Sequence, residues 1–166
     1  MMIVMADGAK KIMIVEDDRF LSFLMKARLE KEGFTVLQVF DGEEAMQALK
    51  QEVPNLVILD LIMPKVTGFE VLKMISITPQ LANVPVVIVS NLAQDSDIEK
   101  ARSYGAKEYF IKVKVSIDDL VGKIKNLVEE TSASSPVSVP AVAEAPAEPA
   151  VPVAQVQEQP ATQMPL

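Results

Sequence analysis

The chain has 166 residues, 49% of them hydrophobic, which is enough for one ordinary domain with a sizeable core. Its 23 acidic residues outnumber its 16 basic ones, and the net charge of −7 argues against direct nucleic-acid binding, because neutralising phosphates needs clustered cations. The absence of Cys and His excludes disulfides, thiolate catalysis, histidine triads and the usual zinc sites, and leaves carboxylates, hydroxyls and amines for any chemistry.

The chain opens with the apolar run MMIVMA, which Asp7 and Gly8 follow at once. This run has no basic leader and is too short for a signal sequence or a membrane span. We therefore treat residues 1–9 as an N-terminal extension and expect a cytoplasmic protein that does not enter a membrane.

From residue 10 to residue 130, strand-like runs alternate with helix-like stretches. The strand-like runs are residues 12–15, 35–40, 56–59, 86–89 and 109–111. The helix-like stretches are residues 19–31, 43–51, 69–77, 96–104 and 118–129. The first, third and fourth runs are apolar throughout, as expected of parallel strands that helices cover on both faces. The pattern predicts an α/β fold, a doubly wound five-stranded parallel sheet with five helices.

Local signals agree with these helices. Gly33 and Gly105 follow predicted helices at positions where a left-handed residue ends a helix. In the first helix, apolar residues recur at the spacing of one buried face. The residues of this predicted buried face are Leu21, Leu24, Met25 and Leu29.

The composition changes near residue 131. From there to the last residue the chain has seven of its eleven prolines and no Lys, Arg, Gly or aromatic residue. Such a segment cannot continue a helix past its prolines and has too few large side chains to offset the entropy of ordering. We expect residues 131–166 to form a disordered, partly polyproline-II tail and not an output domain.

Polar side chains follow four of the predicted strands, at the point where each strand ends. In an open parallel sheet these ends meet at one edge, where ligands bind. Carboxylates that cluster without a basic neighbour are typical of a site for a hard cation, and the small number of converging ligands favours Mg²⁺ over Ca²⁺. The polar side chains at these ends are Glu16, Asp17, Asp18, Asp60, Ser90 and Lys112.

A cation beside Asp60 would make that carboxylate a nucleophile. It could attack a phosphorus atom whose charge the metal and Lys112 partly neutralise, and so form an aspartyl phosphate. Ser90 could donate to one phosphoryl oxygen while Lys112 pairs with another. Taken singly, Ser90 and Lys112 also suit an ordinary turn or helix cap.

Four segments, in this order along the chain, resemble the receiver domain of two-component response regulators, in particular the stand-alone CheY-like receivers. The segments are IMIVEDD, LVILDLIMPKVTG, VPVVIVSN and GAKEYFIK. The resemblance covers residues 10–130 and implies the strand order 2-1-3-4-5. It also implies a phosphoprotein of phosphorelay signal transduction and not an enzyme with a separate substrate.

The resemblance implies that Asp60 is the phosphoacceptor. Its donor would be a sensor histidine kinase or a histidine phosphotransfer protein, and another molecule in any case because the chain has no His. By the same matching Glu16 and Asp17 form an acidic pair. Asp17 and Asp60 bind Mg²⁺ directly, Glu16 binds it through water, and the backbone carbonyl of Ile62 supplies a further ligand. Asp18 lies just beyond the acidic pair and is expected to cap the first helix.

The family pattern also assigns a switch. Ser90 matches the switch hydroxyl, Tyr109 the switch aromatic and Lys112 the phosphate-binding lysine. Phosphorylation is expected to reshape the surface of the fourth helix, fifth strand and fifth helix, which would bind a downstream protein target or form a transient homodimer. The alternative for Tyr109 is an aromatic ring that only packs at the edge of the sheet.

The chain departs from the family pattern after Lys112. Val113 stands where the family has proline, commonly in a cis bond, and a non-proline cis peptide costs about 3 kcal/mol. We expect a trans bond or an altered loop at this point, with Lys114 as an alternative cation.

Three other functions deserve comparison. A phosphohydrolase of the haloacid-dehalogenase type needs a second Asp two residues after its nucleophile, where Ile62 stands. A nucleotide or flavin site needs a Gly-rich or hydroxyl-rich turn after the first strand, where the acidic residues repel phosphate. A receiver that binds proteins without being phosphorylated remains open.

Overall fold

The computed structural model describes residues 8–133. The chain divides into two units, Met1–Ser135 and Pro136–Leu166, and the fold concerns the first of them alone. The predicted N-terminal extension, up to residue 7, and the predicted tail from residue 134 onward lie outside the described residues.

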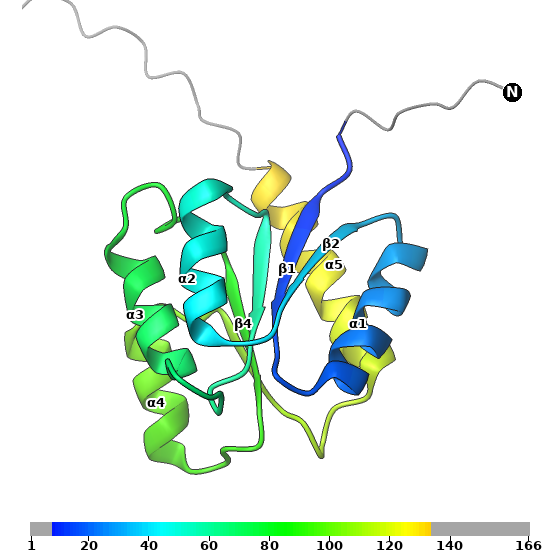
Figure 1. The fold of residues 1–166 in the computed structure, drawn as a ribbon. Coiled ribbons are helices and arrows are strands. Elements are labelled where there is room, and N and C mark those ends of the chain that lie inside the picture. Colours follow the sequence, from blue (N-terminus) through cyan, green and yellow to red (C-terminus); the bar gives the residue numbers. More distant parts are fainter. Residues whose placement is uncertain (1–7, 134–166) are drawn as a thin grey trace, which may run out of the picture. The chain divides into compact units, whose positions relative to one another are not determined.

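All ten predicted elements are present (Figure 1). The strands are β1 (Lys11–Val15), β2 (Thr35–Val39), β3 (Leu56–Leu59), β4 (Val86–Ser90) and β5 (Glu108–Ile111). The helices are α1 (Arg19–Lys31), α2 (Gly42–Gln51), α3 (Gly68–Ile77), α4 (Asp95–Ser103) and α5 (Ile117–Ala133).

The strands form one parallel sheet in the order β2-β1-β3-β4-β5, which confirms the predicted topology. The register places Val15, the last residue of β1, beside Val39 on one side and Leu59 on the other. The residues that follow β1 and β3 therefore leave the sheet side by side.

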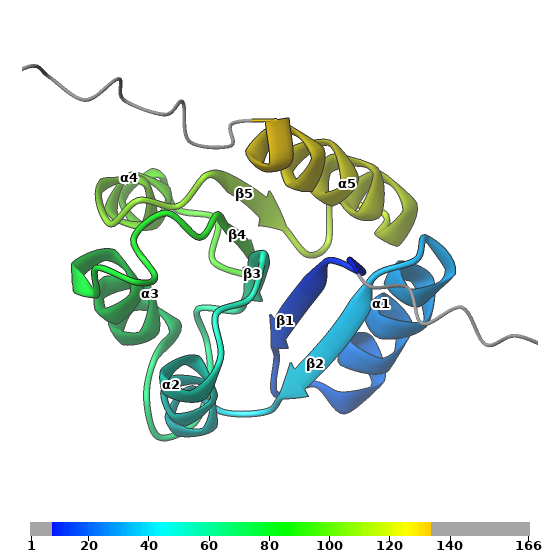
Figure 2. The same cartoon turned by 90° about the horizontal axis from the view of Figure 1, so that it is seen from above.

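Helices cover both faces of the sheet, as its apolar strands predict (Figure 2). Helices α1 and α5 lie on one face, and α2, α3 and α4 lie on the other. Successive residues of a strand point to opposite faces, so Ile12 and Ile14 pack under α1 and α5 while Met13 and Val15 pack under the other three helices. None of the described helices is long and apolar enough to cross a membrane.

The helix ends follow local signals, with one correction. Gly33 and Gly105 have φ values of 90° and 93°, which confirms the predicted left-handed positions after α1 and α4. Helix α5 continues to Ala133, four residues past the helix-like stretch that was predicted to end at residue 129. No proline lies between the start of α5 and Pro136, and the Thr131 hydroxyl donates to the carbonyls of Leu127 and Val128 within the helix.

The predicted buried face of α1 is wrong at one residue. Met25 and Leu29 are buried, but the Leu24 side chain is 39% exposed. The position facing the sheet belongs to Ser22, which is fully buried and accepts a hydrogen bond from Gln38 Nε2 at 2.7 Å. Apolar periodicity cannot detect a polar residue that is buried with its hydrogen-bond partner.

Candidate functional site

The site begins where β1 and β3 end. The Glu16 N–H donates to the Val39 carbonyl (3.1 Å), and the Asp60 N–H donates to the Val15 carbonyl (2.9 Å). These bonds extend the ladder one residue beyond the strands, so both acidic residues have fixed backbones. Glu16 is 1% exposed and Asp60 is 3% exposed.

Lys112 joins these two carboxylates. Its Nζ lies 2.6 Å from Asp60 Oδ2 and 2.8 Å from Glu16 Oε1, and its own N–H donates to the Ser90 carbonyl at 3.0 Å. The expected departure at Val113 takes the form of a turn with trans peptide bonds, closed by the Lys114 N–H on the Ile111 carbonyl (2.9 Å). Lys112 thus reaches the site without the family's proline, while Val113 and Lys114 are exposed.

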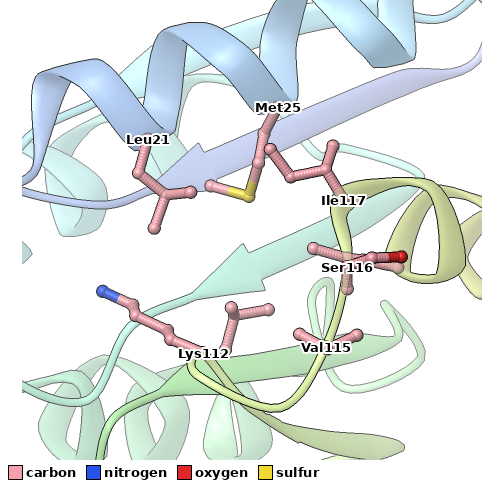
Figure 3. Close-up of a pocket in the computed structure, with 8 residues that line it drawn as sticks. Leu21, Met25, Lys112, Val115, Ser116 and Ile117 are labelled. Atoms are coloured by element: carbon pink, nitrogen blue, oxygen red, sulfur yellow. The ribbon is translucent and has the colours of Figure 1, made fainter.

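The stem of Lys112 lines a cavity of about 30 Å³ between α1 and the connection from β5 to α5 (Figure 3). Its nitrogen points away from Val115 and Ser116 in this view. The other walls are mainly apolar, with Leu21 and Met25 on the α1 side. This packing of the methylene groups leaves only the ammonium end of Lys112 free to meet carboxylates.

A third carboxylate completes the cluster. Glu16, Asp17 and Asp60 each offer one oxygen, and these three atoms lie within 4.8 Å of one another. Only Asp17 among them is exposed to solvent. One ammonium does not balance three carboxylates, and an all-oxygen set with excess negative charge fits a hard divalent cation.

Burial and charge shift the acid–base equilibria of the cluster. Burial raises the pKa of Glu16 from 4.5 to about 7; the charge of Asp60 adds to this, and the hydrogen bond from Lys112 opposes it. For Lys112, burial lowers the pKa, but hydrogen bonds to Asp60 and Glu16 outweigh burial and the net shift is upward. In the metal-free site, Glu16 therefore gains or loses its proton near neutral pH although it contacts the ammonium of Lys112.

This shift predicts a pH dependence of stability for the metal-free protein. Between pH 4.5 and about 7, folded Glu16 keeps a proton that the unfolded chain releases, so the free energy of unfolding falls as the pH rises. The fall attributable to Glu16 is about 3 kcal/mol. Urea unfolding of wild type and Glu16→Gln from pH 5 to pH 8 should show the variant gaining stability relative to wild type as the pH rises. Parallel curves would contradict the shift.

Two further predicted residues flank the cluster. Asp18 Oδ1 accepts the N–H groups of Phe20 and Leu21 at 2.9 and 3.1 Å, which confirms its predicted role as the cap of α1. The Ile62 N–H donates to Asp60 Oδ1 at 3.1 Å. The two oxygens of Asp60 are thus held separately, one by the Ile62 peptide and one by Lys112.

The predicted switch residues meet at the connection after β4. Ser90 is fully buried, and its Oγ accepts the N–H of Leu92 at 3.4 Å. The Tyr109 hydroxyl donates to the Leu92 carbonyl at 2.9 Å, and its ring packs against the core under α2, α3 and α4. Burial raises the pKa of Tyr109, so its hydroxyl stays protonated as a donor. Tyr109 therefore both packs against the core and donates a hydrogen bond to the connection after β4.

Sequence reasoning missed how tightly the segment after Asp60 is packed. A Cβ added at Gly68 would lie 2.0 Å from the Asp60 backbone oxygen, so the first residue of α3 presses on the end of β3. The Gly68 N–H also donates to the Leu61 carbonyl at 3.1 Å. Thr67 caps α3 through a reciprocal pair of hydrogen bonds with Glu70. The sequence signal for this close packing was Gly68 directly after Thr67, a residue type that caps helices.

Residues 12–125 match the family model of the response regulator receiver domain. Among curated relatives, an uncharacterised transcriptional regulatory protein, YcbL of Bacillus subtilis, is 35% identical over 72% of this chain and 51% of its own length. The polar-differentiation response regulator DivK of Brucella anthropi is 30% identical over 70% of this chain and 94% of its own length. The chain spans about half the length of most of the curated relatives it matches first.

Solved structures give the same fold. A CheY-like response regulator receiver domain protein of Methanospirillum hungatei matches with a TM-score of 0.72 and 26% identity, over 77% of this chain and 100% of that one. The phosphorylated cyanobacterial phytochrome response regulator RcpA matches with a TM-score of 0.65 and 31% identity, over 77% of this chain and 97% of that one.

Proposed function

This chain belongs to the response regulator receiver domain family, and on that premise we propose that Asp60 accepts a phosphoryl group from a phosphohistidine. The donor would be a sensor histidine kinase or a histidine phosphotransfer protein, since this chain contains no His. The observation that carries the proposal is Lys112 Nζ lying within 2.8 Å of both Asp60 and Glu16, inside a cluster with one more carboxylate.

In the proposed reaction, an oxygen of Asp60 attacks phosphorus while the phosphorus–nitrogen bond of phosphohistidine breaks. The imidazole of the donor keeps the electron pair of that bond and takes up a proton. The Ile62 N–H holds Oδ1 of Asp60, and Lys112 at Oδ2 can follow the developing charge onto a phosphoryl oxygen. The carboxylate remains oriented throughout because its backbone is part of the sheet ladder.

Bound Mg²⁺ would neutralise part of the phosphoryl charge. The proposed ligands are the carboxylates of Asp17 and Asp60, the Ile62 carbonyl, and Glu16 through water. Support comes from the three carboxylate oxygens that lie within 4.8 Å of one another.

The proposed output is a change in the surface of α4, β5 and α5. Phosphorylation would draw the Ser90 hydroxyl toward the phosphoryl group, and Tyr109 would follow. Both side chains already bond to the backbone of Leu92, so movement of one affects the connection that the other holds. A downstream protein or a second copy of this chain would read the changed surface.

We also propose that the chain acts as a phosphoacceptor and not as an enzyme with a separate substrate, and that it works as a single-domain regulator in the cytoplasm. The apolar side chain of Ile62 supports the first point, because a hydrolase of the alternative kind needs a carboxylic acid there. DivK, which this chain matches over 94% of the relative's length, supports the second. The cytoplasmic setting rests on the family alone.

The test is phosphorylation of the full chain by acetyl phosphate, measured by intact mass spectrometry. We expect one phosphoryl adduct on wild type in the presence of Mg²⁺, none on Asp60→Asn, and none after the metal is chelated. Asp18→Asn is the matched control, because Asn also caps helices and residue 18 lies outside the carboxylate cluster. If wild type took up no phosphoryl group, the phosphoacceptor proposal would fail, and a receiver that only binds proteins would be the remaining function. If Asp60→Asn showed an undiminished adduct, another residue would be the acceptor.

A further inference from the structure

Lys65 has an unusual backbone within the connection from β3 to α3 (residues 60–67). Its φ is 65°, and among the described residues it is the one non-glycine residue with positive φ. The Val66 N–H donates to the Pro64 carbonyl across Lys65 at 2.9 Å, which closes a three-residue turn. Turns of this kind with positive φ at the centre are rare and strained. Strained residues persist where the surroundings determine their conformation.

An ion pair to another element holds this turn. Lys65 Nζ lies 2.7 Å from Asp41 Oδ2 and 3.8 Å from a carboxylate oxygen of Glu43. The other oxygen of Asp41 accepts the Glu44 N–H at 2.8 Å and caps α2. Asp41 is therefore fixed by its own helix, and its side chain is only 18% exposed. Lys65 pairs with a carboxylate that is already oriented.

Backbone packing brings the same two elements together. A Cβ added at Gly42, the first residue of α2, would lie 2.3 Å from the Val66 carbonyl oxygen. The far end of the connection is closed by the Gly68 N–H on the Leu61 carbonyl. The connection is therefore fixed where it leaves β3 and where it enters α3, and the ion pair with Asp41 fixes its apex.

The segment fixed in this way carries the peptide that holds the acceptor carboxylate. The Ile62 N–H donates to Asp60 Oδ1, three residues before Lys65. We propose that Lys65 is a positioning residue, whose ion pair with Asp41 holds the strained turn and thereby keeps the Ile62 peptide directed at Asp60. The consequence for phosphorylation rests on the proposed function, whereas the consequence for the metal-free connection does not.

The test compares four single variants and one double variant, Lys65→Met with Asp41→Ser, of the full chain in metal-free form. Lys65→Met removes the charge and keeps the stem, Lys65→Arg keeps the charge, and Asp41→Ser keeps a capping oxygen without the ion pair. Lys11→Met is the matched control, because it removes another exposed ion pair, to Glu52, at the opposite edge of the sheet. The readout is the rate of amide hydrogen exchange at Gly68 and Ile62, followed by NMR.

We expect Lys65→Met and Asp41→Ser each to speed this exchange about fivefold, and the double variant to exchange no faster than either single one. Lys65→Arg and Lys11→Met should stay within about twofold of wild type. Unchanged exchange in Lys65→Met, an equal effect of Lys11→Met, or additive effects of Lys65→Met and Asp41→Ser would each overturn the proposal.

Phosphorylation by acetyl phosphate then links the turn to the site. Lys65→Met should lower the rate about threefold to fivefold, and Lys65→Arg should restore it. A wild type that takes no phosphoryl group would defeat the proposed function while the exchange experiment still tested Lys65. A phosphorylated wild type with a Lys65→Met variant of equal rate would instead defeat the positioning role alone.

Discussion

Replacing Lys112 by Met is expected to lower the free energy of unfolding of the metal-free protein by about 3 kcal/mol at pH 8. The side chains of Glu16 and Asp60 are 2% and 4% exposed, and Lys112 is the cation that contacts both. Removing it leaves two buried carboxylates that keep backbone N–H donors but, among the described residues, contact no other cation. Breaking one partner out of a buried pair costs far more than the pair contributes as a unit, because the remaining charge has no compensation.

Urea unfolding of wild type and Lys112→Met measures this loss. The loss should shrink at pH 5, where Glu16 is protonated in the folded protein, because its pKa is about 7. Millimolar Mg²⁺ should stabilise the variant more than wild type, since the variant lacks the ammonium that competes with the cation for Asp60 and Glu16. Lys11→Met breaks an exposed ion pair and should cost less than about 1 kcal/mol. A comparable cost in both variants would show that the buried cluster carries no special charge imbalance.

The sheet could be predicted from the sequence because its strands are short and apolar and a helix-like stretch separates each strand from the next. The apolar strands indicated a parallel sheet with one ligand-binding edge, and the family resemblance added the strand order, so Glu16, Asp17, Asp60 and Lys112 could be assigned to one cluster. Polar residues that end adjacent parallel strands must come together, whatever the details of the loops. The direction of each side chain within the cluster could not be predicted from the sequence.

Other features depend on contacts between distant residues, which periodicity does not encode. The ion pair of Lys65 joins positions 24 residues apart and has no local signature. Ser22 is buried with Met25 and Leu29 on one face of α1, where Gln38 on β2 donates a hydrogen bond to it, and Leu24 lies off that face. The end of α5 was predicted too early because the composition changes near residue 131, whereas the next proline of the chain is Pro136.

The carboxylate cluster on which the proposed role of Asp60 depends is also expected to weaken the fold. Three carboxylate oxygens within 4.8 Å of one another share one ammonium, and burial holds Glu16 in a range where it titrates near neutral pH. A core built for stability alone would not contain this imbalance. The proposed metal and the phosphoryl group both gain affinity from it, because each brings charge that the metal-free site lacks or can redistribute.

Gly68→Ala is expected to destabilise the protein by about 3 kcal/mol and to slow phosphorylation at Asp60 by more than about tenfold. The added Cβ would lie 2.0 Å from the Asp60 backbone oxygen and 2.6 Å from the Leu61 Cα, and both are backbone atoms that no rotamer change can move. Helix α3 must therefore shift away from the end of β3. The same shift breaks the Gly68 N–H bond to the Leu61 carbonyl and disturbs the peptide that orients Asp60.

Gly122→Ala in α5 is the matched control, because a Cβ there meets no atom within 4 Å. Alanine replaces glycine inside a helix with a gain of about 1 kcal/mol, so this variant should be more stable than wild type and should be phosphorylated at the wild-type rate. Urea unfolding and intact mass spectrometry after acetyl phosphate treatment measure both quantities for both variants. If the free energy of unfolding of Gly68→Ala stayed within about 0.5 kcal/mol of wild type, α3 could not be packed against the end of β3 as described. If it lost stability but kept its phosphorylation rate, the orientation of Asp60 would depend on the sheet ladder and Lys112 alone.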